Sequence, residues 1–128
     1  MSDPSLYVRL GGYDAIAAAT DDLLGRLLND PVLKDYWKGK SRESLRKDRQ
    51  LIVDYLVEAS GGPAFYCGRD MKSSHAGLGI SEAEWDLFIN HTRAMLEQLA
   101  VPTRERDEVL DFVVGLKAEV VQPITVAV

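Results

Sequence analysis

The stretch GGPAFYCGRDMKSSHAGLGI, residues 61–80, is the most informative part of this chain. It places His75 after a loop rich in glycine and just before the start of a new helix. The chain has only two histidines, and one in this place can reach between helices as a single axial metal ligand. A lone histidine is more often a surface or a hydrogen-bonded core residue, so spacing alone leaves both interpretations open.

Along the rest of the chain, apolar residues recur at spacings of three and four, which predicts helices and no strands. We expect the segment with His75 to form about one helical turn, whose geometry is set by packing. Ser81 and Glu84 form a capping box that opens a helix running to Leu99. The other expected helices cover residues 6–10, 13–29, 31–37 and 43–60, and a last one after Pro102 carries Val109 to Val120 and ends at Pro123.

Length and composition set the broad class. A chain of 128 residues with 46% hydrophobic residues is expected to form a single domain, 1–128, with a compact core. The net charge of -5 argues against a nucleic-acid partner. The basic run KGKSRESLRKDR at 38–49 is either a functional patch or, as we favour, a solvated helix face.

The expected location is the cytoplasm. No apolar run approaches the roughly 20 residues of a membrane span, so no membrane partner is expected. The N-terminus lacks the basic flank and apolar run of a signal peptide. The single cysteine, Cys67, excludes an internal disulfide and is interpreted as an inert thiol in a reducing compartment. His91 lies off the main apolar stripe of its helix and is expected to be solvent-facing or partly covered.

Several features occur in one order along the chain: SLYVRLGG at 5–12, an Asp-Pro step at 30–31, GGP at 61–63, YCGRDMKSSHAGLGI at 66–80, and an aromatic residue at Trp85. This pattern resembles the truncated haemoglobins, specifically the group I branch, over nearly the full chain. The resemblance implies an all-α fold, a two-over-two helical sandwich around one haem b. The histidine of the MKxxH segment, here His75, is then the proximal iron ligand.

The resemblance also places other side chains at the cofactor. The resemblance implies that three residues pack against the haem, whereas composition alone would make them ordinary core residues. They are Met71, Ile80 and Trp85. A cationic group at the mouth of a pocket pairs with a carboxylate, and surface solvation is the alternative for each such group. On this ground Arg69 and Lys72 are candidates for the haem propionates, and Tyr66, the other polar side chain nearby, is a further candidate.

The distal side departs from the family pattern. Group I members typically carry a tyrosine near the middle of the second helix, and alignment puts Leu24 there, so the usual hydrogen-bond donor is missing. We expect any donor to come from Trp37 or from the helix over 43–60. One face of that helix holds Leu45, Asp48, Ile52, Tyr55, Leu56 and Ala59.

Tyr55 and Asp48 are the candidates on that face, and Ile52 lies between them. A phenol such as Tyr55 donates without a change of charge. Asp48 could donate only if a dry pocket kept it protonated, and the alternative is a solvated carboxylate in the helix's first turn.

These residues leave two main functional classes. The first is a haem protein that reversibly binds oxygen, nitric oxide or carbon monoxide. The second is a haem oxidoreductase acting on nitric oxide, nitrite or peroxide, and a reductase is an expected partner for either. A helical interaction module without cofactor is a weaker alternative. A distal donor slows the loss of oxygen, whereas an open apolar pocket favours fast exchange.

Overall fold

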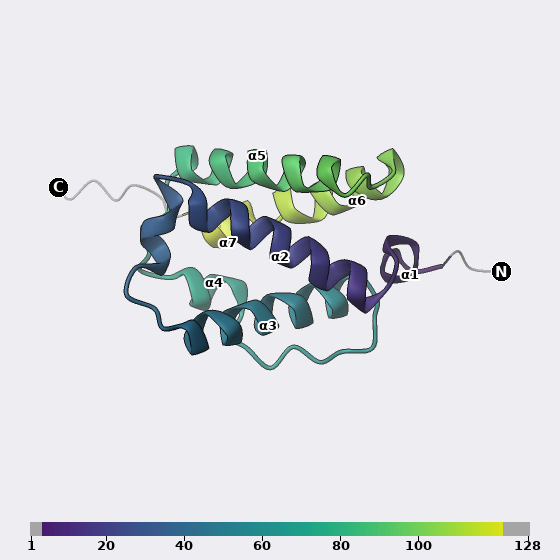
Figure 1. The fold of residues 1–128 in the computed structure, drawn as a ribbon, viewed down its shortest axis with the longest axis horizontal. Coiled ribbons are helices and arrows are strands. Elements are labelled where there is room, and N and C mark those ends of the chain that lie inside the picture. The colour runs from purple at the N-terminus through teal and green to yellow at the C-terminus, as the bar shows by residue number, and fades with distance from the viewer. Residues whose placement is uncertain (1–3, 122–128) are drawn as a thin grey trace.

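The computed structural model describes residues 4–121, and within this range it contains helices and no strands. This confirms the predicted all-α class. The elements, in chain order (Figure 1), are α1 (Leu6–Leu10), α2 (Tyr13–Asn29), the 3-10 helix η1 (Leu33–Trp37), α3 (Arg42–Ala59), α4 (Met71–His75), α5 (Glu82–Gln98), α6 (Thr103–Val114) and α7 (Lys117–Val120).

The four long helices form two packed pairs. Helix α2 packs against α3 on one side and α5 on the other, while α5 packs against α6 and the short α4 packs against α7 (Figure 1). One core cluster lies between α2 and α3 and contains Ile16, Val53 and Val57. The other joins α5, α6 and α7 through Trp85, Ile89, Val113 and Val120. This is the expected two-over-two arrangement.

Local capping chemistry sets most helix ends. The Ser81 hydroxyl accepts from the Glu84 amide at 3.1 Å, and the Glu84 carboxylate accepts from the Ser81 amide at 3.0 Å, so the predicted capping box is confirmed. Ser41 starts α3 in the same way by accepting from the Ser44 amide. Gly11 ends α1 with a φ of 109°, a backbone conformation that glycine adopts without strain.

The expectation of one last helix through Val120 is wrong. The α-helical ladder tightens at Leu116, whose amide bonds to the Val113 carbonyl, three residues back instead of four, and α6 ends at Val114. Gly115 at this break has a low helix preference, and α7 starts afresh at Lys117. The predicted stop at Pro123 lies outside the described residues.

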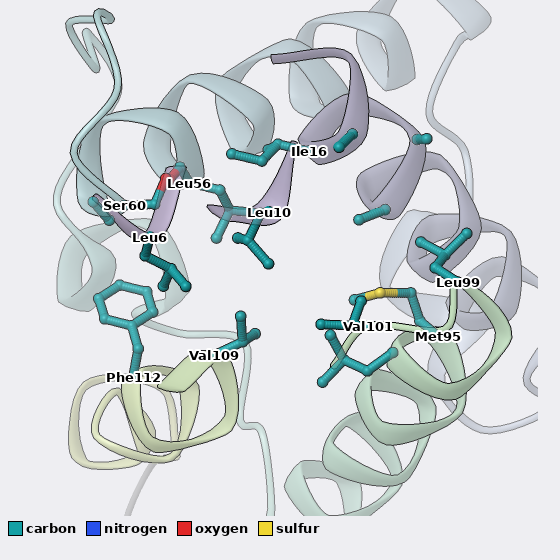
Figure 2. A pocket seen from close by; sticks show the side chains of 15 residues that line it. Leu6, Leu10, Ile16, Leu56, Ser60, Met95, Leu99, Val101, Val109 and Phe112 are labelled. Carbon is teal, nitrogen blue, oxygen red and sulfur yellow. The ribbon is translucent and has the colours of Figure 1, made fainter. Parts of the chain in front are cut away.

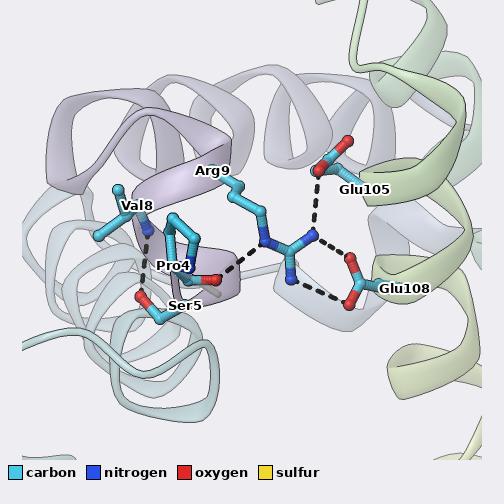
Figure 3. A network of polar contacts seen from close by, with 6 residues as sticks. All are labelled: Pro4, Ser5, Val8, Arg9, Glu105 and Glu108. Carbon is cyan, nitrogen blue, oxygen red and sulfur yellow. Dashed lines mark hydrogen bonds and ion pairs between the residues drawn. The ribbon is translucent and has the colours of Figure 1, made fainter. Parts of the chain in front are cut away.

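Arg9 ties helix α1 to α6 (Figure 3). Its guanidinium donates to Glu105 at 3.0 Å, to both carboxylate oxygens of Glu108, and to the Pro4 carbonyl at 3.1 Å. The bonds to Glu108 and then Glu105 raise the pKa of Arg9, which therefore stays charged. The Tyr7 amide adds a 2.9 Å bond to the Ser60 carbonyl at the end of α3. These contacts hold α1 against both α3 and α6.

Among the described residues, the helices are too short or too polar for any of them to cross a lipid bilayer.

Candidate functional site

Helix α4 presents His75 at its last position. The Asp70 side chain caps the helix by accepting from the Ser73 amide at 3.0 Å. Hydrogen bonds from the Ser73 hydroxyl, and then from its amide, lower the pKa of the Asp70 carboxyl. Two glycines with positive φ, at 77 and 79, then turn the chain toward α5. The predicted single turn of helix around His75 is therefore present.

The ring of His75 is held by its own turn of helix. Its Nδ1 lies 2.8 Å from the Met71 carbonyl oxygen and 3.0 Å from the Ser74 hydroxyl. A carbonyl oxygen can only accept, so the proton of a neutral imidazole sits on Nδ1 and the lone pair sits on Nε2. This is the tautomer in which a histidine donates through Nε2 to a metal, with its other nitrogen bonded to a backbone carbonyl.

Apolar side chains surround α4 on the side of α5 and α7. Trp85 is 4% exposed and stacks at a tilt against Phe88, with ring centroids 5.4 Å apart. Met71 and Ile80 are half-buried and pack against the same cluster. Trp85 is therefore part of the core. Met71, on the same short helix as His75, and Ile80, just before α5, extend this core toward α4.

Helix α3 has two differently used faces. Val53 and Val57, fully buried at 0% and 1% exposure, seal the contact with Ile16 of α2. The predicted face with Ile52 and Tyr55 is only half-buried and turns away from that seam. The second face was predicted from the sequence and the first was not, because both follow a helical period and only the position of α2 distinguishes them.

Tyr55 lies in an aromatic group on this half-buried face. Its ring meets Tyr66 edge-on at a centroid distance of 5.3 Å and Phe112 at 6.1 Å. Burial, and then the negative charge of Glu119, raise the pKa of the Tyr55 phenol. The hydroxyl thus stays protonated at neutral pH and keeps its capacity to donate a hydrogen bond.

The carboxylate of Asp48 is occupied by a different partner. It forms an ion pair with the Lys40 ammonium, which folds the loop before α3 back onto its second turn. An ionised carboxylate accepts hydrogen bonds and donates none. Of the two side chains considered as hydrogen-bond donors on this face, Tyr55 is therefore the one suited to donate.

The segment η1, which carries the half-buried Trp37, is fixed to α5 by polar contacts. Asp30, 8% exposed, accepts from His91 Nε2 at 2.6 Å, and its other oxygen accepts from the Val32 and Leu33 amides. The His91 contact first, and then the two amides, lower the pKa of Asp30. His91 is half-buried, and its pairing with Asp30 was not predicted from the sequence.

A second contact ties the other end of η1. The Tyr36 hydroxyl donates to Glu84 at 2.8 Å, and burial together with that carboxylate raises the pKa of Tyr36 to about 12. Trp37 therefore sits on an element whose position is set by α5.

The three propionate candidates differ in availability. Arg69 and Lys72 are exposed on either side of the start of α4. The Tyr66 hydroxyl already donates to the Arg69 carbonyl, and its amide donates to Glu58 at 2.7 Å. Cys67, between them, is an exposed free thiol.

A cavity of about 330 Å³ lies between α1, α2, α3, α5 and α6 (Figure 2). Fourteen of its fifteen lining residues are apolar, Ser60 is the exception, and none belongs to α4. This cavity was not predicted from the sequence. The feature that could have indicated it is a run of small side chains in α2, and three of them, Ala15, Ala18 and Ala19, line the cavity.

The donor set also limits the kind of metal site. Across residues 4–121, no group of three or more His, Cys, Asp or Glu side chains is placed to hold a metal ion. A metal at His75 would have to bring most of its ligands with it, as an iron porphyrin does. The Nδ1-protonated tautomer fits such a group.

Comparison with known proteins agrees with this picture. The family model "Bacterial-like globin" matches residues 5–122. The group 1 truncated haemoglobin GlbN of Mycolicibacterium paratuberculosis is 31% identical over 91% of this chain and 83% of its own length. That of Tetrahymena thermophila is 29% identical over 93% and 89%.

Solved structures share the fold. The truncated haemoglobin of Tetrahymena pyriformis in its Fe(III) form superposes with a TM-score of 0.84 at 23% identity, covering 94% of this chain and all of that one. The 2/2 haemoglobin of Synechococcus, in a cyanomet state with covalently attached haem, gives a TM-score of 0.80 at 26% identity, covering 91% and 95%.

Proposed function

Because this chain belongs to the bacterial-like globin family, and within it to the group 1 truncated haemoglobins, we propose that residues 1–128 form one globin domain that binds haem b through His75. The bound group would supply an iron atom with one position for a diatomic gas: oxygen, nitric oxide or carbon monoxide. The observation that carries the proposal is the hydrogen bond from His75 Nδ1 to the Met71 carbonyl, which leaves Nε2 as the electron-pair donor.

The chain's own residues have distinct roles in this proposal. The Met71 carbonyl holds the imidazole plane and its tautomer. Met71 and Ile80 would shield the proximal side with apolar surface, and the exposed Arg69 and Lys72 would pair with the propionates. The apolar cavity next to Leu56 favours small uncharged molecules over ions and water.

The test of His75 is an absorption spectrum of protein reconstituted with haem, in ferric, ferrous and carbonyl forms. His75→Ala is expected to lose haem or its five-coordinate ferrous spectrum, and added imidazole should restore it. His91→Gln is the matched control, since it removes the other histidine, and it should keep the wild-type spectrum. An unchanged ferrous spectrum in His75→Ala would exclude this ligand.

Haem b is proposed in preference to a covalently attached haem. Acidified butanone should extract all of the pigment from the holoprotein into the organic phase. Pigment that stays with the protein would show a covalent bond and overturn this part of the proposal.

Tyr55 is the proposed distal donor. A net hydrogen bond contributes about 0.5–1.5 kcal/mol, so Tyr55→Phe should speed oxygen release by roughly 2- to 13-fold. Tyr13→Phe, on an exposed tyrosine of α2, is the control and should leave the rate unchanged. If Tyr55→Phe has no effect while Leu24→Tyr slows release about tenfold, α3 supplies no donor, and the alternative as a haem oxidoreductase acting on nitric oxide, nitrite or peroxide gains weight.

A further inference from the structure

The charge of this chain is unevenly distributed. Residues 34–49 hold seven of the fifteen basic residues and three of the twenty acidic ones, a formal charge of +4. The other 112 residues therefore carry -9. One short segment, formed by η1, the following loop and the first two turns of α3, has the opposite sign to the rest of the molecule.

Ion pairs within the protein use only part of this positive charge. Lys40 pairs with Asp48, and Arg49 pairs with Asp21 of α2. Five further cations on the segment are exposed and appear in no ion pair among the described residues. We name them the basic surface: Lys34, Lys38, Arg42, Arg46 and Lys47.

Two features of the fold bring part of the basic surface together. Arg42 and Arg46 are four residues apart and so lie on one side of α3. The Lys40–Asp48 pair draws the loop that contains Lys38 back onto the same two turns. The same pair neutralises Asp48, one of the two acidic residues in the first two turns of α3; the other is Glu43.

The same two elements also bear candidate site residues. Trp37 lies on η1 between Lys34 and Lys38, and Ile52 and Tyr55 lie one to two turns after Lys47 on α3. A helix with its side chains is about 10–12 Å across. A protein docked on the basic surface would therefore lie about one helix thickness from the face of α3 that we assign to the haem.

We propose that the basic surface docks a small acidic electron-carrier protein that reduces the haem iron, an inference that rests on the function proposed above. One electron would pass from a reduced iron–sulfur or flavin centre of the carrier to the ferric iron that a bound haem would supply. The carrier would be oxidised by one electron, the iron would be reduced to the ferrous state, and no atom would be transferred. The partner is small and acidic because complementary charge orients such encounters and speeds them by 10- to 1,000-fold.

The rest of the protein's charge favours a small partner over an extended polyanion. A nucleic acid or an anionic membrane presents negative charge over a wide area and would also meet the surface that carries -9. A compact acidic protein can contact the basic surface alone. Its binding would weaken with salt, because exposed charges are screened beyond about 8–10 Å at physiological ionic strength.

The first test measures binding to holoprotein and to apoprotein, with a plant-type [2Fe–2S] ferredoxin as the acidic probe. We expect amide chemical shifts to move in η1 and early α3, and affinity to fall at least tenfold between 20 and 500 mM salt. Arg46→Glu and Lys47→Glu should each weaken binding about 3- to 10-fold at low salt. Arg93→Glu, the same change on an exposed arginine of α5, should change it less than twofold.

The second test follows reduction of the ferric holoprotein. Arg46→Glu should slow reduction by the ferredoxin and leave reduction by free, neutral flavin unchanged. The proposal is overturned if the ferredoxin does not bind, if Arg93→Glu weakens binding as much as Arg46→Glu does, or if duplex DNA or phosphatidylserine vesicles bind the basic surface more tightly than the ferredoxin. A failure to bind haem, seen in the spectrum of the wild type, would instead contradict the proposed function.

Discussion

Truncation of two neighbouring residues on α3, Val53 and Ile52, should lower stability in both cases and weaken haem binding in only one. Val53 is fully buried against Ile16, so Val53→Ala removes two methyl groups from the packed seam between α2 and α3. Their transfer free energy is about 1.6 kcal/mol, and the cavity left behind raises the loss of unfolding free energy to about 2–3 kcal/mol. Since this seam does not face His75, apoprotein and holoprotein should lose the same amount.

Ile52→Ala removes three carbons from the half-buried face next to Val53. Part of that surface is already in water, so the apoprotein should lose about 1.5–2 kcal/mol. The holoprotein should lose about 1 kcal/mol more, since we propose that this face contacts the haem, and haem affinity should fall roughly fivefold.

The assay is urea unfolding of both forms, with haem transfer to an acceptor protein as a measure of affinity. Val114→Ala is the control: a valine of α6 that is 48% exposed, whose truncation should cost under about 0.5 kcal/mol. If Val53→Ala weakens haem binding as much as Ile52→Ala does, the two faces of α3 are wrongly assigned.

Two further predictions concern stability. The pKa of Asp30 is lowered in the folded state, so its negative charge stabilises the fold at pH values above the usual aspartate pKa near 4, and this contribution is lost as the pH falls below that value. In thermal melts from pH 7 to pH 2, Asp30→Asn should be less stable than the wild type at pH 7 and should lose less stability on acidification. An unchanged loss of stability in acid would contradict the role of the His91 pair. Gly62→Ala places a Cβ 2.5 Å from the Tyr7 ring and should destabilise the protein. Gly25→Ala, inside α2, adds a Cβ that meets no atom outside its own helix backbone within 4 Å, so it should stabilise the protein by about 0.5–1 kcal/mol. Equal effects of the two substitutions in the same melts would refute this contrast.

Sequence predicted best where structure depends on near neighbours. The Ser81–Glu84 capping box and the stop at Gly11 each depend on a few adjacent residues, and both are present. The break at Gly115 was missed because the apolar stripe continues across it from Val113 to Leu116, so the hydrophobic pattern gave no sign of a stop.

Features that depend on distant contacts were less accessible. The Asp30–His91 pair joins residues 61 positions apart, and the local sequence around neither residue predicts the other as its partner. The cavity is a consequence of small side chains in α2 meeting larger ones from four other helices. For the same reason, the face of α3 that α2 covers could not be distinguished from the face with Tyr55.

His75 lies between these two cases. Its position in MKSSH was evident from the sequence, but its role depends on the carbonyl of Met71, one turn earlier on the same short helix. That carbonyl also accepts from the Ser74 hydroxyl at 3.0 Å, and in an α-helix it faces the amide of residue 75 as well. It lies within reach of the ring only while these five residues stay helical. The tautomer of His75 is therefore a property of the folded α4, and the Asp70 cap that starts this turn acts through the helix on the ligand that we propose.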